Sequence, residues 1–229
     1  MSFRGTDAAG NVSEVVSYTV GNIDKVAPVK PTASADITSP TNTDVLVTAV
    51  FSDDSAVKEY SLDGQIWKAY TTAIRFAENG SVYFRGTDTA GNTSGITSYS
   101  VSNINKVAPD KPVATVDVTV PTNTAVRVSA IFNENSVSNE YSLDNQNWQA
   151  YTGAITFTEN GTVYFRSTDE AGNVSETTSY EVTNIDKVAP DQPTASADVT
   201  SPTNTDVLVT AVFSDDSAVK EYSTDGQNW

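Results

Sequence analysis

The chain contains no cysteine and no histidine among its 229 residues. Without cysteine no disulfide can hold a folded module together, so an apolar core must do so. Without histidine, catalysis by an imidazole and transition-metal sites with histidine ligands are both excluded. The lack of cysteine does not by itself indicate a reducing compartment.

Basic residues and long apolar runs are also scarce. The 13 Lys and Arg residues face 29 Asp and Glu residues, which gives a formal net charge of −16. Such a charge repels nucleic acid and anionic membranes and favours divalent cations. No apolar stretch approaches the roughly 20 residues of a membrane span, and no signal-peptide pattern opens the sequence. We therefore expect neither nucleic-acid binding nor membrane insertion of this segment.

What is present is an internal repeat with a period of 81 residues. The heptapeptide Asn-Ile-Asp/Asn-Lys-Val-Ala-Pro occupies residues 22–28, 103–109 and 184–190. The stretches 32–67 and 194–229 differ only at Ile37/Val199, Leu62/Thr224 and Ile66/Asn228. Such repetition favours a structural or display protein over an enzyme, because a catalyst needs one asymmetric site whereas an array needs the same module many times.

The repeat divides the chain into four segments, and its phase suggests a longer parent protein. We expect two complete modules, 24–104 and 105–185, flanked by the last part of one module, 1–23, and the first part of another, 186–229. Phe3 to Asp7 match Phe84 to Asp88, and Trp229 matches Trp67. We therefore expect a piece of a longer array, and neither end segment has enough strands to close a core by itself.

Differences between the copies reveal which side chains point inward. Leu46 is replaced by Arg127 in the next copy, whereas Val45 and Val47 return as valines. The alternation has period two, which is typical of a half-buried strand. The same comparison predicts that Val82 and Phe84 point inward, and no stretch has helical periodicity.

Turn sequences separate these strands at short intervals, among them Asp63-Gly64 and Glu78-Asn79-Gly80. About seven strands per repeat without a helix predict an all-β fold of tandem immunoglobulin-like antiparallel β-sandwiches. Each linker contains two prolines, such as Pro28 and Pro31, which favour an extended and semi-rigid connection.

The order of motifs resembles the bacterial immunoglobulin-like repeats of large surface adhesins and S-layer-associated proteins. The likeness rests on Tyr60-Ser61-Leu62-Asp63-Gly64 with Trp67 and Tyr70, on Gly80 with Tyr83-Phe84-Arg85, on Thr87 to Asn92, and on the linker ending in Ala-Pro. It covers essentially the whole chain. It implies an extracellular location at the bacterial cell surface, and it leaves open whether the repeats serve in an adhesin, a biofilm protein or a polysaccharide-acting enzyme.

The resemblance also implies a calcium site at each module junction. In the calcium-binding members, an Asp-x-Ala-Gly-Asn turn and an aspartate of the linker hold the ion, and calcium favours such carboxylate and carbonyl oxygens. The positions that correspond in this chain are Asp7, Asn11, Asp24, Asp88, Asn92, Asn105, Asp169, Asn173 and Asp186.

Two features of the chain depart from that pattern. Asn105 lacks the linker carboxylate, and Lys25, Lys106 and Lys187 bring a positive charge where the family often has threonine. Either change weakens the case for an ion. The alternative interpretation is that Asp88 and Asn92 satisfy backbone groups of the turn while Gly91 supplies a positive φ.

The aromatic residues suggest a second kind of site. Flat rings stack on sugars, so Tyr60, Trp67, Tyr70 and Tyr83 could bind a glycan. We expect Trp67 and Tyr60 to fill or cover the core instead. Tyr83 and its counterpart Tyr164 alternate with inward residues, so they are expected to point outward.

Together these patterns predict a non-enzymatic stalk or spacer of a large bacterial adhesin or surface fibre, stiffened by calcium if calcium binds. The predicted partners of each repeat are its neighbours in the chain, with surface glycans or host proteins contacted through other domains. Two alternatives remain: repeats that each bind a glycan or host protein and act by avidity, and accessory repeats of a secreted polysaccharide-acting enzyme.

Overall fold

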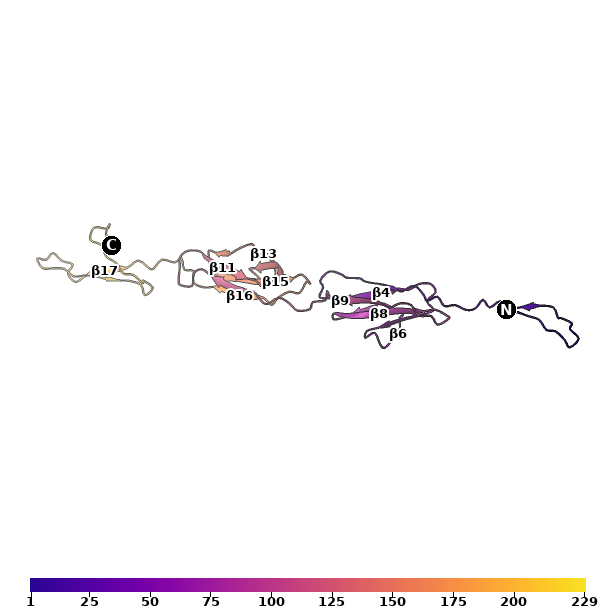
Figure 1. Ribbon diagram of the computed structural model, residues 1–229. Helices are drawn as coiled ribbons and strands as arrows, with labels where there is room; N and C mark the ends of the chain where they lie inside the picture. The colour runs from indigo at the N-terminus through magenta and orange to yellow at the C-terminus, as the bar shows by residue number, and fades with distance from the viewer. The chain divides into compact units, whose positions relative to one another are not determined.

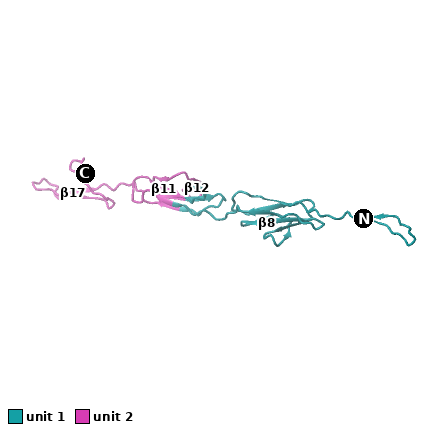
Figure 2. Ribbon diagram, in the orientation of Figure 1, with its two compact units in different colours: residues 1–113, 132–141, 165–178 teal, residues 114–131, 142–164, 179–229 magenta.

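The computed structural model describes residues 1–229 and contains strands but no helices. It therefore offers no helix that could cross a lipid bilayer. Contacts group the chain into two compact units, shown in separate colours in Figure 2. The first comprises residues 1–113, 132–141 and 165–178, and the second comprises the remaining residues.

The first complete repeat forms two antiparallel sheets (Figure 1). The three-stranded sheet has the order β3-β4-β7 and the four-stranded sheet the order β6-β5-β8-β9. The strands are β3 (Thr32–Ala35), β4 (Val45–Val50), β5 (Val57–Ser61), β6 (Lys68–Ala69), β7 (Ile74–Phe76), β8 (Gly80–Thr87) and β9 (Thr97–Val101). This is the all-β, immunoglobulin-like sandwich that the turn spacing predicts.

The core lies between these sheets and is filled by the residues that the alternation assigns to it. Val45 and Val47 of β4 are fully buried, while Leu46 between them is exposed. On the opposite sheet, Val82 and Phe84 of β8 are fully buried as well. The period-two prediction is confirmed for both strands, because alternate side chains of a pleated strand face opposite sides.

Tyr70 anchors one edge of this core. Its ring meets Phe84 edge-on at 5.4 Å between centroids, and its hydroxyl accepts a hydrogen bond of 3.0 Å from the backbone N–H of Ala49. A phenol that is apolar along its body and polar at its tip suits such a border position.

Trp67 does not fill the core, contrary to expectation. Its ring lies under the guanidinium of Arg85, 4.0 Å from the ring centroid, on the outer face of the four-stranded sheet. Arg85 in turn donates a hydrogen bond of 2.8 Å to Glu59. Tyr60 does pack against the core. On that face the cation–π contact with Arg85 stabilises the ring.

The second repeat has the same two strand orders, β10-β11-β14 and β13-β12-β15-β16. Its strands are β10 (Val113–Val116), β11 (Val126–Ile131), β12 (Ser136–Ser142), β13 (Gln149–Ala150), β14 (Ile155–Phe157), β15 (Gly161–Asp169) and β16 (Thr178–Val182). Val126, Val128, Val163 and Phe165 are fully buried, as their counterparts are in the first repeat.

The end segments form only isolated strand pairs. β1 (Ser2–Phe3) pairs with β2 (Val16–Ser17), and β17 (Thr194–Ala197) pairs with β18 (Val209–Val212). Val209 is 66% exposed, whereas Val47, the same residue of the near-identical stretch, is fully buried. Each pair therefore presents the apolar face that a second sheet covers in the complete repeats.

A local turn after β5 forms in all three copies. In the first copy Asp63 accepts hydrogen bonds of 2.8 Å from the backbone N–H groups of Ile66 and Gln65 and from the Ser61 hydroxyl. Asp225 makes the same bonds in the last segment. The position after the aspartate has positive φ, with Gly64 in the first copy and Asn145 in the second, a residue type that tolerates this conformation.

The hydrogen bonds of this turn predict a lowered pKa for its aspartate. The Ile66 N–H, followed by the Gln65 N–H and the Ser61 hydroxyl, lowers the pKa of Asp63 to about 2 from 3.8. Because the pKa is lower in the folded chain, the turn is stabilised above pH 3.8 and loses this stabilisation as the pH falls through about 2. NMR titration of the Asp63 carboxyl carbon should give this pKa, and Asp225 should also titrate below the ordinary range. Ordinary values at both positions would contradict the hydrogen bonds.

Candidate functional site: the turns and linkers

The Asp-x-Ala-Gly-Asn turn closes on itself through its aspartate. The Asp88 Oδ1 accepts hydrogen bonds from the backbone N–H groups of Ala90 and Asn92, at 2.9 and 2.8 Å. Its Oδ2 accepts one of 2.8 Å from the Asn92 side-chain amide. Gly91 has φ 91°, as the tight reversal requires. The turn therefore has the structural role that the sequence offered as one interpretation.

The same bonds recur around Asp7 with Asn11 and around Asp169 with Asn173. The Asn92 amide is the main cause of a lowered pKa at Asp88, and the Asn11 amide has this effect at Asp7. Burial raises the pKa of Asp169, but the Asn173 bonds outweigh it and the net shift is downward. All three aspartates are therefore ionised acceptors at neutral pH.

Each turn asparagine of the complete repeats also reaches back to the linker before its own repeat. The Asn92 amide donates to the Asp24 carbonyl at 3.3 Å, and the Asn173 amide donates to the Asn105 carbonyl at 2.9 Å. The structure thus brings Asp24 to the turn of the first repeat and Asn105 to that of the second.

The second linker has an additional bond that the first lacks. The side-chain amide of Asn105 donates to Asp169 Oδ2 at 2.9 Å, while its Oδ1 accepts from the Val107 N–H at 3.0 Å. These two partners determine the orientation of the amide, because only its nitrogen can donate to a carboxylate. Asp24 instead uses Oδ1 to accept from the Val26 N–H.

The remaining predicted residues, Asp7, Asn11 and Asp186, make no bond that joins a turn to a linker. Asp186 Oδ1 accepts from the Val188 N–H at 2.9 Å, and its backbone N–H donates to Thr122. Asp7 and Asn11 bond within their own turn. The nine residues therefore fall into one group around Asp88, one around Asp169, an isolated turn, and Asp186.

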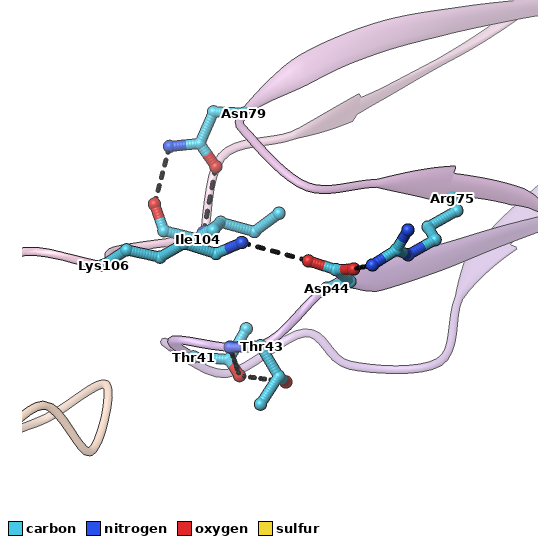
Figure 3. Close-up of polar contacts among 7 residues, drawn as sticks. All are labelled: Thr41, Thr43, Asp44, Arg75, Asn79, Ile104 and Lys106. Carbon is cyan, nitrogen blue, oxygen red and sulfur yellow. Dashed lines mark hydrogen bonds and ion pairs between the residues drawn. The ribbon is translucent and has the colours of Figure 1, made fainter.

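The start of the second linker is bound to the end of the first sandwich, a contact that the sequence did not reveal. The Asn79 side chain brackets Ile104: the Ile104 N–H donates to Asn79 Oδ1 at 2.9 Å, and Asn79 Nδ2 donates to the Ile104 carbonyl at 3.0 Å (Figure 3). The flanking residue Asn105 donates its backbone N–H to the Thr41 carbonyl at 2.8 Å. In the sequence this contact is marked only by the recurrence of Asn79 as Asn160, and a turn residue would recur in the same way.

An ion cluster lies beside this bracket. Lys106 contacts Asp44 at 3.0 Å, and Arg75 contacts the same carboxylate (Figure 3). The Lys106 bond is the largest cause of the lowered pKa of Asp44. The linker lysine is therefore paired with the first sandwich. In the second repeat the counterparts of Asp44 and Arg75 are Ala125 and Thr156, so this cluster is not repeated.

Calcium fits the two linkers unequally. A calcium ligand must present oxygen, yet at the second linker the side chain of Asn105 presents an N–H group to Asp169. This donor set does not suit the ion. At the first linker, Asp24 keeps a carboxylate, so calcium there stays a prediction. Across residues 1–229 no three acidic side chains are grouped as a metal site.

Known proteins resemble this chain in structure but not in sequence. The sequence matches no protein family profile and no curated protein. Among solved structures, the chain is similar to the fibronectin(III)-like modules of CbhA from Clostridium thermocellum, at 11% identity and a TM-score of 0.33. The match covers 68% of this chain and 95% of that one. The assignment of the fold rests on the two sheets themselves.

Proposed function

We propose that the repeats are a non-enzymatic spacer within a longer extracellular protein of the bacterial surface, comparable to the stalk of an adhesin. In this role each module keeps the next at a set distance and the array carries no chemistry. The observation that best supports this is the second linker, in which five consecutive residues, 103–107, are all hydrogen-bonded.

The bonds of that linker run in two directions. Asn103 donates to the carbonyls of Ile37 and Ser39, and Ile104 is bracketed by Asn79, so its first residues belong to the preceding sandwich. Asn105 is bonded to Asp169 and Asn173 of the following repeat. A flexible tether would leave these backbone groups to water, whereas a linker bonded on both sides restricts the hinge.

A direct contact adds to the same restriction. The backbone N–H of Asn42, at the end of the first sandwich, donates to the carbonyl of Ala171 in the turn of the second repeat at 3.1 Å. The carboxylates of the site accept bonds from their own turn and linker, so they are not the free and opposed pair that acid–base catalysis needs. A mechanical role uses these contacts as they are.

The test is a distance distribution across the second linker. Because the chain has no cysteine, spin labels can be placed by Leu46→Cys and Arg127→Cys at matching exposed positions of β4 and β11. We expect pulsed electron–electron double resonance to give one narrow distance distribution. A broad distribution would contradict the restricted spacer and favour a flexible tether.

The second candidate function is a binding array, and the outward tyrosines favour it. Tyr83 lies on β8 between the buried Val82 and Phe84, and Tyr164 has the same place on β15. Their half-buried rings are on the outer face, as predicted, and they recur at the same position. Binding of the chain to a glycan array, abolished by Tyr83→Ser with Tyr164→Ser, would support this function over the spacer.

A further inference from the structure

We infer that Asn105 makes the second linker independent of calcium, because its side-chain amide gives Asp169 a hydrogen-bond donor in the place of an ion. The inference rests on the proposed spacer and deepens it, because it concerns which contacts restrict the motion of the second linker, residues 103–107. It assigns different behaviour to two linkers whose sequences differ at residues 24 and 105, Asp and Asn.

The contact joins one charged group, the Asp169 carboxylate, to neutral amide donors. Asp169 is buried and ionised, and its Oδ2 receives two N–H donors, one from Asn173 and one from Asn105. A carboxylate with two such donors at 2.9 Å is satisfied without a cation. An aspartate at position 105 would instead place a second negative charge against Asp169, and like charges at this distance repel.

The backbone carbonyl of Asn105 forms a second bond to the turn. We call the two bonds, from the Asn105 side chain to Asp169 and from Asn173 to the Asn105 carbonyl, the clamp. The carbonyl accepts the Asn173 amide at 2.9 Å, so residue 105 both donates to and accepts from the turn. At the first linker the corresponding bond from Asn92 to the Asp24 carbonyl is longer, 3.3 Å, and no side-chain bond to Asp88 accompanies it. The second linker therefore has its own donor to the turn aspartate and a shorter bond from the turn asparagine, whereas the first linker has neither.

The lysine after residue 105 does not replace the amide as a donor. Lys106 is paired with Asp44 of the preceding sandwich, so Asn105 is the residue that brings a donor to Asp169 from the linker. Since Asp24 and Asp186 keep the carboxylate, the array contains an amide linker between two acidic ones. In such a segment the second linker stays restricted when calcium is absent.

The experiment exchanges the two linker types, Asn and Asp, in the chain of residues 1–229. With spin labels at Leu46→Cys and Arg127→Cys, the distance distribution should be equally narrow in chelator and in millimolar calcium. Asn105→Asp should broaden it in chelator, and calcium should narrow it again. Asn123→Asp, which adds the same charge at an exposed position of the second repeat, is the matched control and should change nothing.

A local readout separates failure of the clamp from failure of the spacer. The side-chain amide protons of Asn173 should exchange at least about tenfold faster with solvent in Asn105→Asp than in the parent chain in chelator, because the bond from this amide to the carbonyl of residue 105 is lost when the linker leaves the turn. A parent chain that narrows only with calcium, or an unchanged Asn105→Asp, would overturn the inference. A broad parent distribution with protected Asn173 amides would reject the spacer and keep the clamp.

The reverse substitution at the first linker tests the inference even if Asn105→Asp does not fold. Asp24→Asn should create at the first linker the side-chain bond that the second linker has, and so slow exchange of the Asn92 side-chain amide in chelator. Unchanged exchange of Asn92 would show that an amide at this position does not form the clamp, and would overturn the inference even if Asn105→Asp failed to fold.

Discussion

Replacing Phe84 with alanine is expected to unfold the first sandwich at temperatures where the second remains folded. The side chain is fully buried, and its ring meets those of Tyr70 and Phe51 at 5.4 and 6.4 Å. Removing a buried phenylalanine costs about 3–5 kcal/mol, which is a large part of the roughly 5–15 kcal/mol that stabilises a domain. Differential scanning calorimetry should show one of the main transitions lowered by more than about 12 °C.

The chain supplies its own control for this substitution. Phe3 opens the same Phe-Arg-Gly-Thr-Asp sequence as Phe84 but is 55% exposed. Phe3→Ala should leave the main transitions within about 0.5 kcal/mol of the parent chain, as is usual for surface substitutions. Equal effects at both positions would mean that the core between β4 and β8 is not what stabilises the repeat.

Replacing Asn79 with alanine is expected to detach the second linker from the first sandwich and to destabilise that sandwich. The substitution leaves the N–H and carbonyl of Ile104 without partners, and Ile104 is only 8% exposed. Unsatisfied buried backbone groups cost about 1–3 kcal/mol. For a module of this size that lowers the melting midpoint by roughly 4–8 °C for each kcal/mol.

Two further variants test the bracket. Asn79→Asp keeps the acceptor for the Ile104 N–H and loses the donor to its carbonyl, so its midpoint should lie between those of the parent and Asn79→Ala. Asn160 makes the same two bonds to Ile185, and Asn160→Ala should lower the transition of the second repeat in the same way. If Asn79→Ala melted like the parent chain, the bracket would have no stabilising role.

Much of the sandwich could be predicted from the sequence because its strands are half buried. Comparing Leu46 with Arg127 identified the solvent face of β4, and the structure confirms that Val45 and Val47 lie on the other. Trp67 was misplaced because an aromatic residue next to a strand suits either a core or an outer stack, and only the position of Arg85 across the sheet decides between them.

In the candidate site, too, the local contacts could be predicted and the long-range contacts could not. Asp88 and Asn92 could be identified because the turn closes within five residues and its composition is characteristic. The bond from Asn105 to Asp169 and the bracket of Asn79 on Ile104 could not be, because they join residues far apart in the chain. No local pattern indicates which asparagine will meet which backbone group after the sheets have packed.

The chain contains a direct comparison of local and tertiary control. The sequence Val-Lys-Glu-Tyr-Ser occurs at residues 57–61 and 219–223, yet only the first copy is a strand, where it pairs with β8. The turn that follows each copy forms the same bonds around Asp63 and Asp225. The turn satisfies its backbone groups within a few residues, so the sequence by itself determined it.

A strand cannot do the same, since its N–H and carbonyl groups need a neighbouring strand. The tertiary structure therefore decided whether Val-Lys-Glu-Tyr-Ser became β5, whether Val47 and Val209 were buried or exposed, and which linker residue met which turn. The sequence determined the repeat, the turns and the alternation of faces, because these depend on nearest neighbours and on the pleat of a strand.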